Sequence, residues 1–139
     1  MTHTEIIAVK LFGWEACETP PIETDPNVRW YQKMGSREHL EYVGYRSDDA
    51  DICGTIYRTV GWPNFADERL KWYSIRQMED ALAKRWLLKQ YMLTIDGEFT
   101  VKASDPMPGT CITWQSFAML RATAAQRVEA AVKVLEGQG

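Results

Sequence analysis

Aromatic and arginine side chains form the group in this 139-residue sequence that could bind a ligand. Aromatic rings can stack on a nucleobase, and a guanidinium group can donate two parallel hydrogen bonds to a phosphate. Both types recur in the middle of the chain, which predicts a pocket for a small nucleotide-like ligand. The candidate ligand-binding residues are Tyr45, Arg46, Tyr57, Arg58, Trp62, Phe65, Arg69 and Trp72. For Trp62, Phe65 and Trp72 a place in the core is the preferred interpretation, because large aromatics dominate small cores. Tyr57, Arg58 and Arg69 are the better candidates for ligand binding.

Catalytic patterns are missing from the sequence. It has no G-x-S-x-G turn, no glycine-rich phosphate loop and no H-E-x-x-H helix. Its two histidines are His3, beside the N-terminus, and His39, in a charged segment, and we interpret both as surface residues. We therefore predict that the protein is not an enzyme. The alternative is an enzyme that acts on nucleotides through Asp48, Asp49 or His39.

No metal or cofactor is predicted. Asp48, Asp49 and Asp51 concentrate carboxylates, which are the ligands that hard cations prefer, but they lack the ligand spacing and the glycine of a calcium loop. A solvated acidic turn is the preferred interpretation. The three cysteines lie far apart without a C-x-x-C pair, so we expect reduced thiols.

Charge and hydropathy exclude two classes of partner. Sixteen basic and nineteen acidic residues give a formal net charge of -3, which does not favour sequence-independent binding of nucleic acid. No stretch approaches the roughly 20 apolar residues of a membrane span, and the N-terminus lacks the pattern of a signal peptide. We expect a cytoplasmic protein without a membrane partner.

Three helices are predicted from capping boxes, in which a Ser or Thr and a Glu or Gln three residues later satisfy the first backbone N–H groups. The first helix covers about residues 3–12 and ends near Gly13. The second follows Ser74, with Ile75, Met78, Leu82 and Trp86 on one apolar stripe. The third follows Thr123, with Val128, Ala131, Val132 and Leu135 on its apolar face and Gly137 at its end. The three boxes are Thr2 with Glu5, Ser74 with Gln77, and Thr123 with Gln126.

Strands are predicted between these helices. Residues 90–95 and 98–103 flank Asp96-Gly97, a pair that favours hairpin turns, and residues 112–120 are rich in β-branched and aromatic side chains. Residues 28–34 and 39–46, around Gly35-Ser36, are possible strands, and residues 52–60 could be a strand or an extended loop. The predicted class is α/β of the α+β type, with a mainly antiparallel sheet sandwiched by helices. Its order is helix, strands and loops, helix, hairpin, strand, helix.

The order of motifs resembles the phage ABA sandwich family of small phage-encoded proteins. The resemblance rests on an opening helix that ends in Gly13-Trp14, on Trp62-Pro-Asn-Phe-Ala66 ahead of a long helix, and on the closing segment 122–135. It covers the first dozen residues and about 61–137. The resemblance implies one domain over residues 1–139, with an insertion at 15–60, in a protein of viral origin. It brings no catalytic residues, so the activity stays open.

Two binding functions follow from these observations. The first is a phage accessory protein that counters host defence by sequestering a nucleotide-derived signal, which would favour a homo-oligomer with pockets between copies. The second is a protein that inhibits a host defence protein through an exposed aromatic surface. A deep pocket with arginine at its floor would favour the first, and a flat or convex aromatic surface would favour the second.

Overall fold

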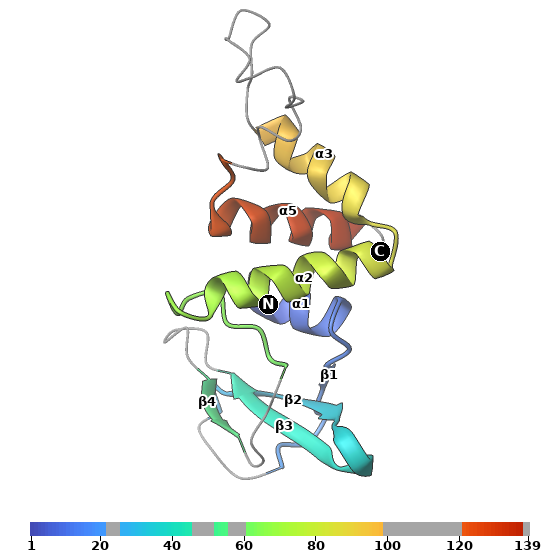
Figure 1. Ribbon diagram of the computed structural model, residues 1–139. Coiled ribbons are helices and arrows are strands. Elements are labelled where there is room, and N and C mark those ends of the chain that lie inside the picture. Colours follow the sequence, from blue (N-terminus) through green and yellow to red (C-terminus); the bar gives the residue numbers. More distant parts are fainter. Residues whose placement is uncertain (22–25, 46–51, 56–60, 99–120, 138–139) are drawn as a thin grey trace, which may run out of the picture.

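The computed structural model describes residues 1–21, 26–45, 52–55, 61–98 and 121–137. An antiparallel sheet occupies one end of the molecule and the helices occupy the other (Figure 1). The predicted α+β class is therefore confirmed. The described helices lie together on one side of the sheet (Figure 1), so these residues do not show the expected placement of helices on both faces.

Helix α1, His3–Lys10, begins with the predicted capping box. The Glu5 N–H donates to Thr2 Oγ1 (3.2 Å), and the Thr2 N–H donates to Glu5 Oε1 (3.0 Å). The helix ends as predicted near Gly13, whose φ of +82° lies in the region that glycine adopts readily. This turn lets the Trp14 N–H donate to Ala8 O (3.0 Å) and directs the chain into the sheet.

The sheet has the strand order β1-β2-β3-β4, with every neighbouring pair antiparallel. Its strands are β1 Glu15–Ala16, β2 Arg29–Met34, β3 Leu40–Tyr45 and β4 Ile52–Thr55. The predicted strand over 28–34 is confirmed by β2, and the one over 39–46 is confirmed by β3 as far as Tyr45. The region 52–60 is a strand over 52–55, whereas 46 and 56–60 lie outside the described residues. A short 3-10 turn, Ser36–Glu38, joins β2 to β3. Gly44 lies opposite Trp30, where a Cβ would come within about 3.0 Å of the indole, so glycine permits this close packing.

Two apolar clusters meet at α1. Ile7 belongs to the cluster formed with the other helices, whereas Ala8 belongs to the cluster formed with the sheet. Phe12, just after the helix, packs against both clusters. Helix α1 is therefore buried on two sides and forms the middle layer of the fold.

Helix α2, Lys71–Lys84, begins four residues before the predicted position, since its N-cap is Leu70 and not Ser74. Ser74 is not its N-cap: the side chain is buried and its Oγ accepts a hydrogen bond from the Asn64 N–H (3.0 Å). The predicted stripe of Ile75, Met78 and Leu82 is fully buried. Trp86 was wrongly placed on it, since the helix ends at Lys84.

Helix α3, Leu88–Glu98, contradicts the predicted hairpin. Residues 90–95 are helical, and Asp96-Gly97 lies inside the helix. Tyr91 and Ile95, four residues apart, are buried in the helical cluster, and this burial favours a helix over the local preference of the Asp-Gly pair. The rest of the predicted hairpin, 99–103, and the predicted strand 112–120 lie outside the described residues.

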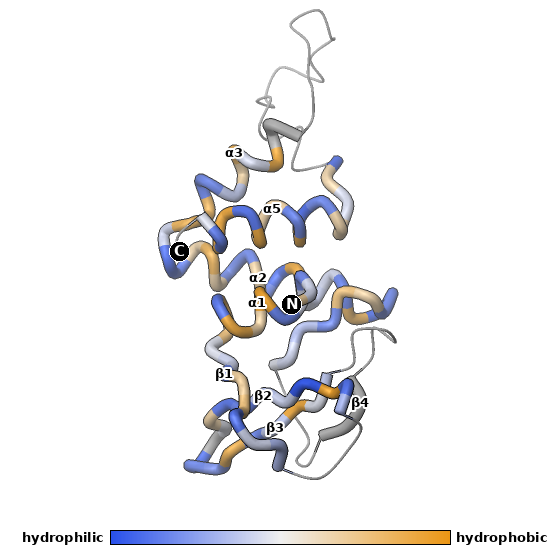
Figure 2. The backbone as a smooth tube through the Cα atoms, turned by 180° about the vertical axis from the view of Figure 1, so that it is seen from behind, coloured by the Kyte–Doolittle hydropathy of each residue, from blue (hydrophilic) through white to orange (hydrophobic). Residues whose placement is uncertain are grey.

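Helix α5, Ala124–Gly137, confirms the third predicted helix. The Thr123 N–H donates to Gln126 Oε1 (2.9 Å), and the Gln126 N–H donates to Thr123 Oγ1 (3.2 Å). The tube in Figure 2 alternates along α5 between polar and apolar stretches, as expected for one buried face. That face includes the predicted Val128, Ala131, Val132 and Leu135.

Candidate binding surface

Tyr45 and Trp62, two of the predicted ligand-binding residues, are core residues. Only 8% of Trp62 is exposed, and Tyr45 is also buried. The Trp62 ring packs against those of Trp14 (centroids 5.3 Å apart), Tyr31 (5.3 Å) and Tyr45 (5.6 Å). The rings join the sheet to the Gly13 turn and to the segment before α2, so their main physical role is packing.

Phe65 is half-buried and packs against the helical cluster. With Tyr45 and Trp62 it lines a hollow of about 50 Å³, which has room for water and not for a nucleotide. Among the described residues, the buried indole N–H groups of Trp14 and Trp62 have no hydrogen-bond partner. Three further predicted residues, Arg46, Tyr57 and Arg58, lie outside the described residues.

Arg69 and Trp72, the last two predicted residues, lie on the surface where α2 begins. The side chain of Arg69 is 90% exposed, and its Nε lies 3.8 Å from Asp67 Oδ1. Trp72 is 49% exposed, and its neighbours Tyr73 and Leu70 are 62% and 46% exposed. Arg76, one turn along the helix, is exposed as well. We call these residues, Arg69, Leu70, Trp72, Tyr73 and Arg76, the α2 aromatic surface.

Contacts with other helices hold this surface in place. The Arg127 guanidinium lies 5.7 Å from the centre of the Trp72 ring, a cation–π contact between α5 and α2. Arg127 Nη1 also donates to Glu79 Oε2 (2.8 Å), which accepts a second hydrogen bond from the Tyr91 hydroxyl (2.7 Å). Burial and this bond to Glu79 raise the pKa of Tyr91 well above its ordinary value. The network joins α2, α3 and α5, so the surface has a rigid support.

A second buried network, around Glu5, is structural. The Glu5 carboxylate accepts from Arg29 Nε (2.6 Å), Arg29 Nη2 (2.5 Å) and the Tyr31 hydroxyl. Burial alone would raise the pKa of Glu5, but the hydrogen bonds from Arg29, the Thr2 backbone and Tyr31 outweigh it and lower the pKa to about 2. The carboxylate therefore stays ionised at neutral pH and ties α1 to β2. Both of its oxygens accept these hydrogen bonds, which assigns the carboxylate a structural role.

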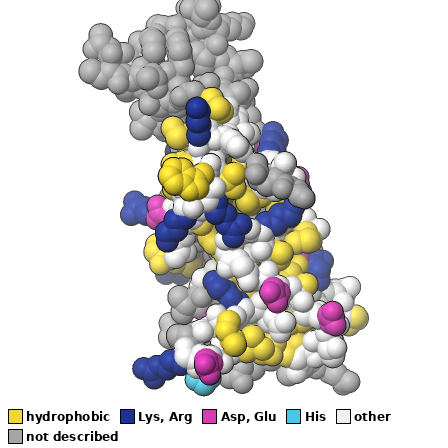
Figure 3. Space-filling view, turned by 90° about the vertical axis from the view of Figure 1, so that its right-hand side faces the viewer, with side chains coloured by type: hydrophobic (Ala, Val, Ile, Leu, Met, Phe, Trp, Pro, Cys, Tyr) yellow, Lys and Arg dark blue, Asp and Glu magenta, His cyan; other side chains and the backbone are white. Residues whose placement is uncertain are grey.

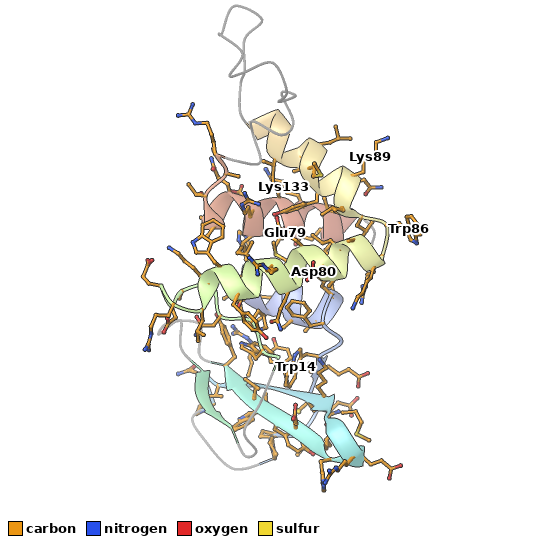
Figure 4. The ribbon with its side chains drawn as sticks, in the orientation of Figure 1. Trp14, Glu79, Asp80, Trp86, Lys89 and Lys133 are labelled. Atoms are coloured by element: carbon orange, nitrogen blue, oxygen red, sulfur yellow. The ribbon has the colours of Figure 1, made fainter. Side chains whose placement is uncertain are left out.

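Sequence reasoning missed Trp86, which is 90% exposed and is the most exposed aromatic among the residues that the structure describes. Helical spacing placed it on the buried stripe, but the helix ends at Lys84 and the side chain points away from the molecule beside Lys89 (Figure 4). The signal in the sequence was the pair Lys84-Arg85 directly before Trp86, since basic residues are favoured in the last turn of a helix. On this side of the molecule, apolar and basic side chains mix at the level of the helices (Figure 3).

An open hollow of about 280 Å³ lies between α2 and the sheet. It is lined by two lysines, Lys33 from β2 and Lys84 from α2, with Asp80 and Phe12. Lys33 also lines a neighbouring hollow and lies 5.6 Å from the centre of the Trp14 ring. These cations could hold a small anion, although no predicted ligand-binding residue contributes.

The remaining predictions concern metals, cysteines and histidines. Among the described residues, no three His, Cys, Asp or Glu side chains gather as a metal site would require. Asp48, Asp49 and Asp51 lie outside the described residues. Cys17 is a free thiol whose pKa is raised by burial, and both His3 and His39 are exposed, as expected.

None of the helices in the described part of the chain is both long and apolar enough to span a bilayer. No family model, no curated protein and no solved structure matches this chain, so the resemblance to the phage ABA sandwich family stays a prediction.

Proposed function

We propose that this chain is a non-enzymatic binding module that docks on a partner protein through the α2 aromatic surface. The observation that carries the proposal is the exposure of Leu70, Trp72 and Tyr73 within four residues at the start of one helix. Neighbouring exposed apolar residues of this kind mark interaction sites more often than isolated ones do. Tryptophan, tyrosine and arginine are also the residues that dominate binding energy at protein interfaces.

The rigidity of the support strengthens this proposal. Trp72 is held by Arg127, and the Tyr73 hydroxyl accepts a hydrogen bond from Gln77 Nε2 (3.1 Å) on the same helix. Side chains that are already ordered lose less conformational entropy on binding. The surface is thus suited to recognition without rearrangement.

The two binding functions suggested by the sequence can be compared on this basis. An exposed aromatic surface was the feature expected of a protein that binds another protein. Among the described aromatics, Trp72, Tyr73 and Trp86 are exposed, whereas Tyr45 and Trp62 lie in the core. Inhibition of a host defence protein is one activity that such a surface could serve, and the phage origin behind it rests on the resemblance alone. The oligomeric state likewise stays a prediction.

Replacing both Trp72 and Tyr73 by alanine is expected to weaken binding of the partner by about 30-fold or more, because loss of hot-spot aromatics costs at least about 2 kcal/mol. The tagged protein would be used to recover a stoichiometric partner from extracts of its native cells. The purified partner would then be titrated with the wild type and the variant by calorimetry.

Met34→Ala is the matched control, because Met34 is also a large exposed apolar residue but lies on β2. Its affinity for the partner should equal that of the wild type. The proposal fails if no stoichiometric partner is recovered, or if the double variant binds the partner as tightly as the control does.

A second candidate function is binding of a small anion, such as the nucleotide-like ligand suggested by the sequence, in the hollow between Lys33 and Lys84. The two cations and the adjoining ring of Phe12 favour it. If it is correct, a ribonucleotide mixture should raise the melting temperature of the wild type but not that of Lys33→Ala/Lys84→Ala. An equal response of both proteins, or none, would contradict binding in this hollow.

A further inference from the structure

Trp86 occupies a backbone position that normally belongs to glycine. Its φ is +62°, in the left-handed region, where a Cβ carries a steric cost. The Trp86 N–H donates to Ala83 O (3.1 Å), and the Leu87 N–H donates to Leu82 O (2.9 Å). These bonds form the Schellman motif that ends α2, in which glycine is the usual residue at the left-handed position.

The fold makes no visible use of the Trp86 indole. The side chain is 90% exposed, and the apolar contact typical of this motif is made instead by Leu82 and Leu87, which both pack in the helical cluster. Arg85, the preceding residue, donates to Lys10 O (2.5 Å) and Leu11 O (3.1 Å) and so fastens α2 to the end of α1. The turn that ends α2, called the α2 corner below, is thus stabilised by Leu82, Arg85 and Leu87. Trp86 adds only backbone strain and an exposed apolar side chain to it.

The charges around Trp86 point to the kind of surface it would meet. Lys84 and Lys89 are exposed on either side of it, and neither forms an ion pair with any described residue. Arg76 on the α2 aromatic surface is likewise exposed without an ion pair among the described residues. The one exposed acid between these cations on α2 is Asp80. This stretch is therefore basic although the whole chain has a net charge of -3.

We infer that Trp86 is the second anchor of the partner interface and that the partner surrounds an apolar pocket for its indole with acidic side chains. This inference rests on the proposed function. Fourteen residues separate Trp72 from Trp86, which corresponds to about 20 Å at 1.5 Å per residue. A standard interface of about 800 Å² per partner can cover both anchors. A single buried tryptophan with cations at the rim is the arrangement that concentrates binding energy and speeds association.

Trp86→Gly tests this inference because folding and binding should change in opposite directions. Relief of the left-handed strain should raise the folding equilibrium constant about fivefold, measured by urea unfolding. Affinity for the purified partner should fall at least tenfold, whereas Trp86→Tyr should keep most of it. Lys84→Glu/Lys89→Glu should also weaken binding of the partner, and the loss of affinity should be larger at low salt than at high salt.

The outcomes separate this inference from the proposed function. If Trp86→Gly binds normally while Trp72→Ala/Tyr73→Ala does not, the second anchor is wrong and the proposed function stands. If both bind normally, the proposed function fails as well. A less stable Trp86→Gly protein would show that the α2 corner needs the indole for folding, which overturns the inference. Unchanged binding by Lys84→Glu/Lys89→Glu would contradict the inference that acidic side chains of the partner surround the pocket.

Discussion

Replacing Glu5 by glutamine is expected to lower the free energy of unfolding by roughly 3 kcal/mol at neutral pH. Glutamine can still accept from the Thr2 N–H, so the helix cap survives, but it cannot pair with the Arg29 guanidinium. The Glu5 carboxylate is fully buried and takes two hydrogen bonds from Arg29 and one from Tyr31. Urea unfolding of the two proteins at pH 7 would measure the loss.

The Glu5–Arg29 pair also predicts how the free energy of unfolding depends on pH. The pKa of Glu5 is lowered from 4.5 to about 2 in the folded protein, so the folded state binds fewer protons than the unfolded state in this range. The stabilisation is complete above about pH 5 and is lost as the pH falls toward 2. The difference in unfolding free energy between wild type and Glu5→Gln should therefore shrink over that window, while other carboxylates affect both proteins equally.

Glu129→Gln provides the control for this prediction. Glu129 pairs with Lys133 on the surface of α5 at 3.5 Å, and both side chains are about half exposed. Such a pair contributes about 0.3–0.5 kcal/mol. Two results would show that the buried pair is not stabilising. One is that Glu5→Gln lowers the free energy of unfolding no more than Glu129→Gln does. The other is that the difference between wild type and Glu5→Gln stays the same from pH 5 to pH 2.

The parts of the fold that local chemistry determines were predictable from the sequence. The capping boxes at Thr2 and Thr123 and the left-handed turn at Gly13 depend on side chains within a few residues of each other. The box at Ser74 failed because a distant partner, the Asn64 N–H, takes the serine oxygen, and the helix could then begin at Lys71. Long-range hydrogen bonds of this kind leave no local pattern.

Tertiary packing also explains why the hairpin at Asp96-Gly97 was wrong. An Asp-Gly pair favours a turn only when nothing else depends on the conformation of the flanking residues. Here Tyr91 and Ile95 gain burial against the other helices when this segment is helical. The expected gain from burying two such side chains, about 1.5–3 kcal/mol each, exceeds the cost of one glycine in a helix, which is about 1 kcal/mol.

The candidate site was only partly predictable, because composition does not distinguish a buried aromatic from an exposed one. Of the described candidates, Trp62 and Tyr45 pack in the core, whereas Trp72 and Arg69 lie on the surface. Trp86 was assigned to the core by a periodicity that continued past the end of its helix. Burial is a property of the whole fold, so it had to be read from the structure.

Trp62→Ala gives the largest stability effect that we expect, a loss of about 3–5 kcal/mol, because it removes a large buried ring. Trp62 contacts the rings of Trp14, Tyr31 and Tyr45, which come from three separate segments, so the cavity would weaken the junction between the sheet and the chain before α2. Urea unfolding monitored by circular dichroism would measure the change. Trp62→Phe should lose less, since it fills part of the space.

This variant also separates the two interpretations of the aromatic residues. If Trp62 served mainly to stack on a ligand, alanine would leave the stability of the ligand-free protein nearly unchanged, as we expect for the 90% exposed Trp86 when it is replaced by alanine. A change below about 0.5 kcal/mol for Trp62→Ala would therefore contradict the core assignment.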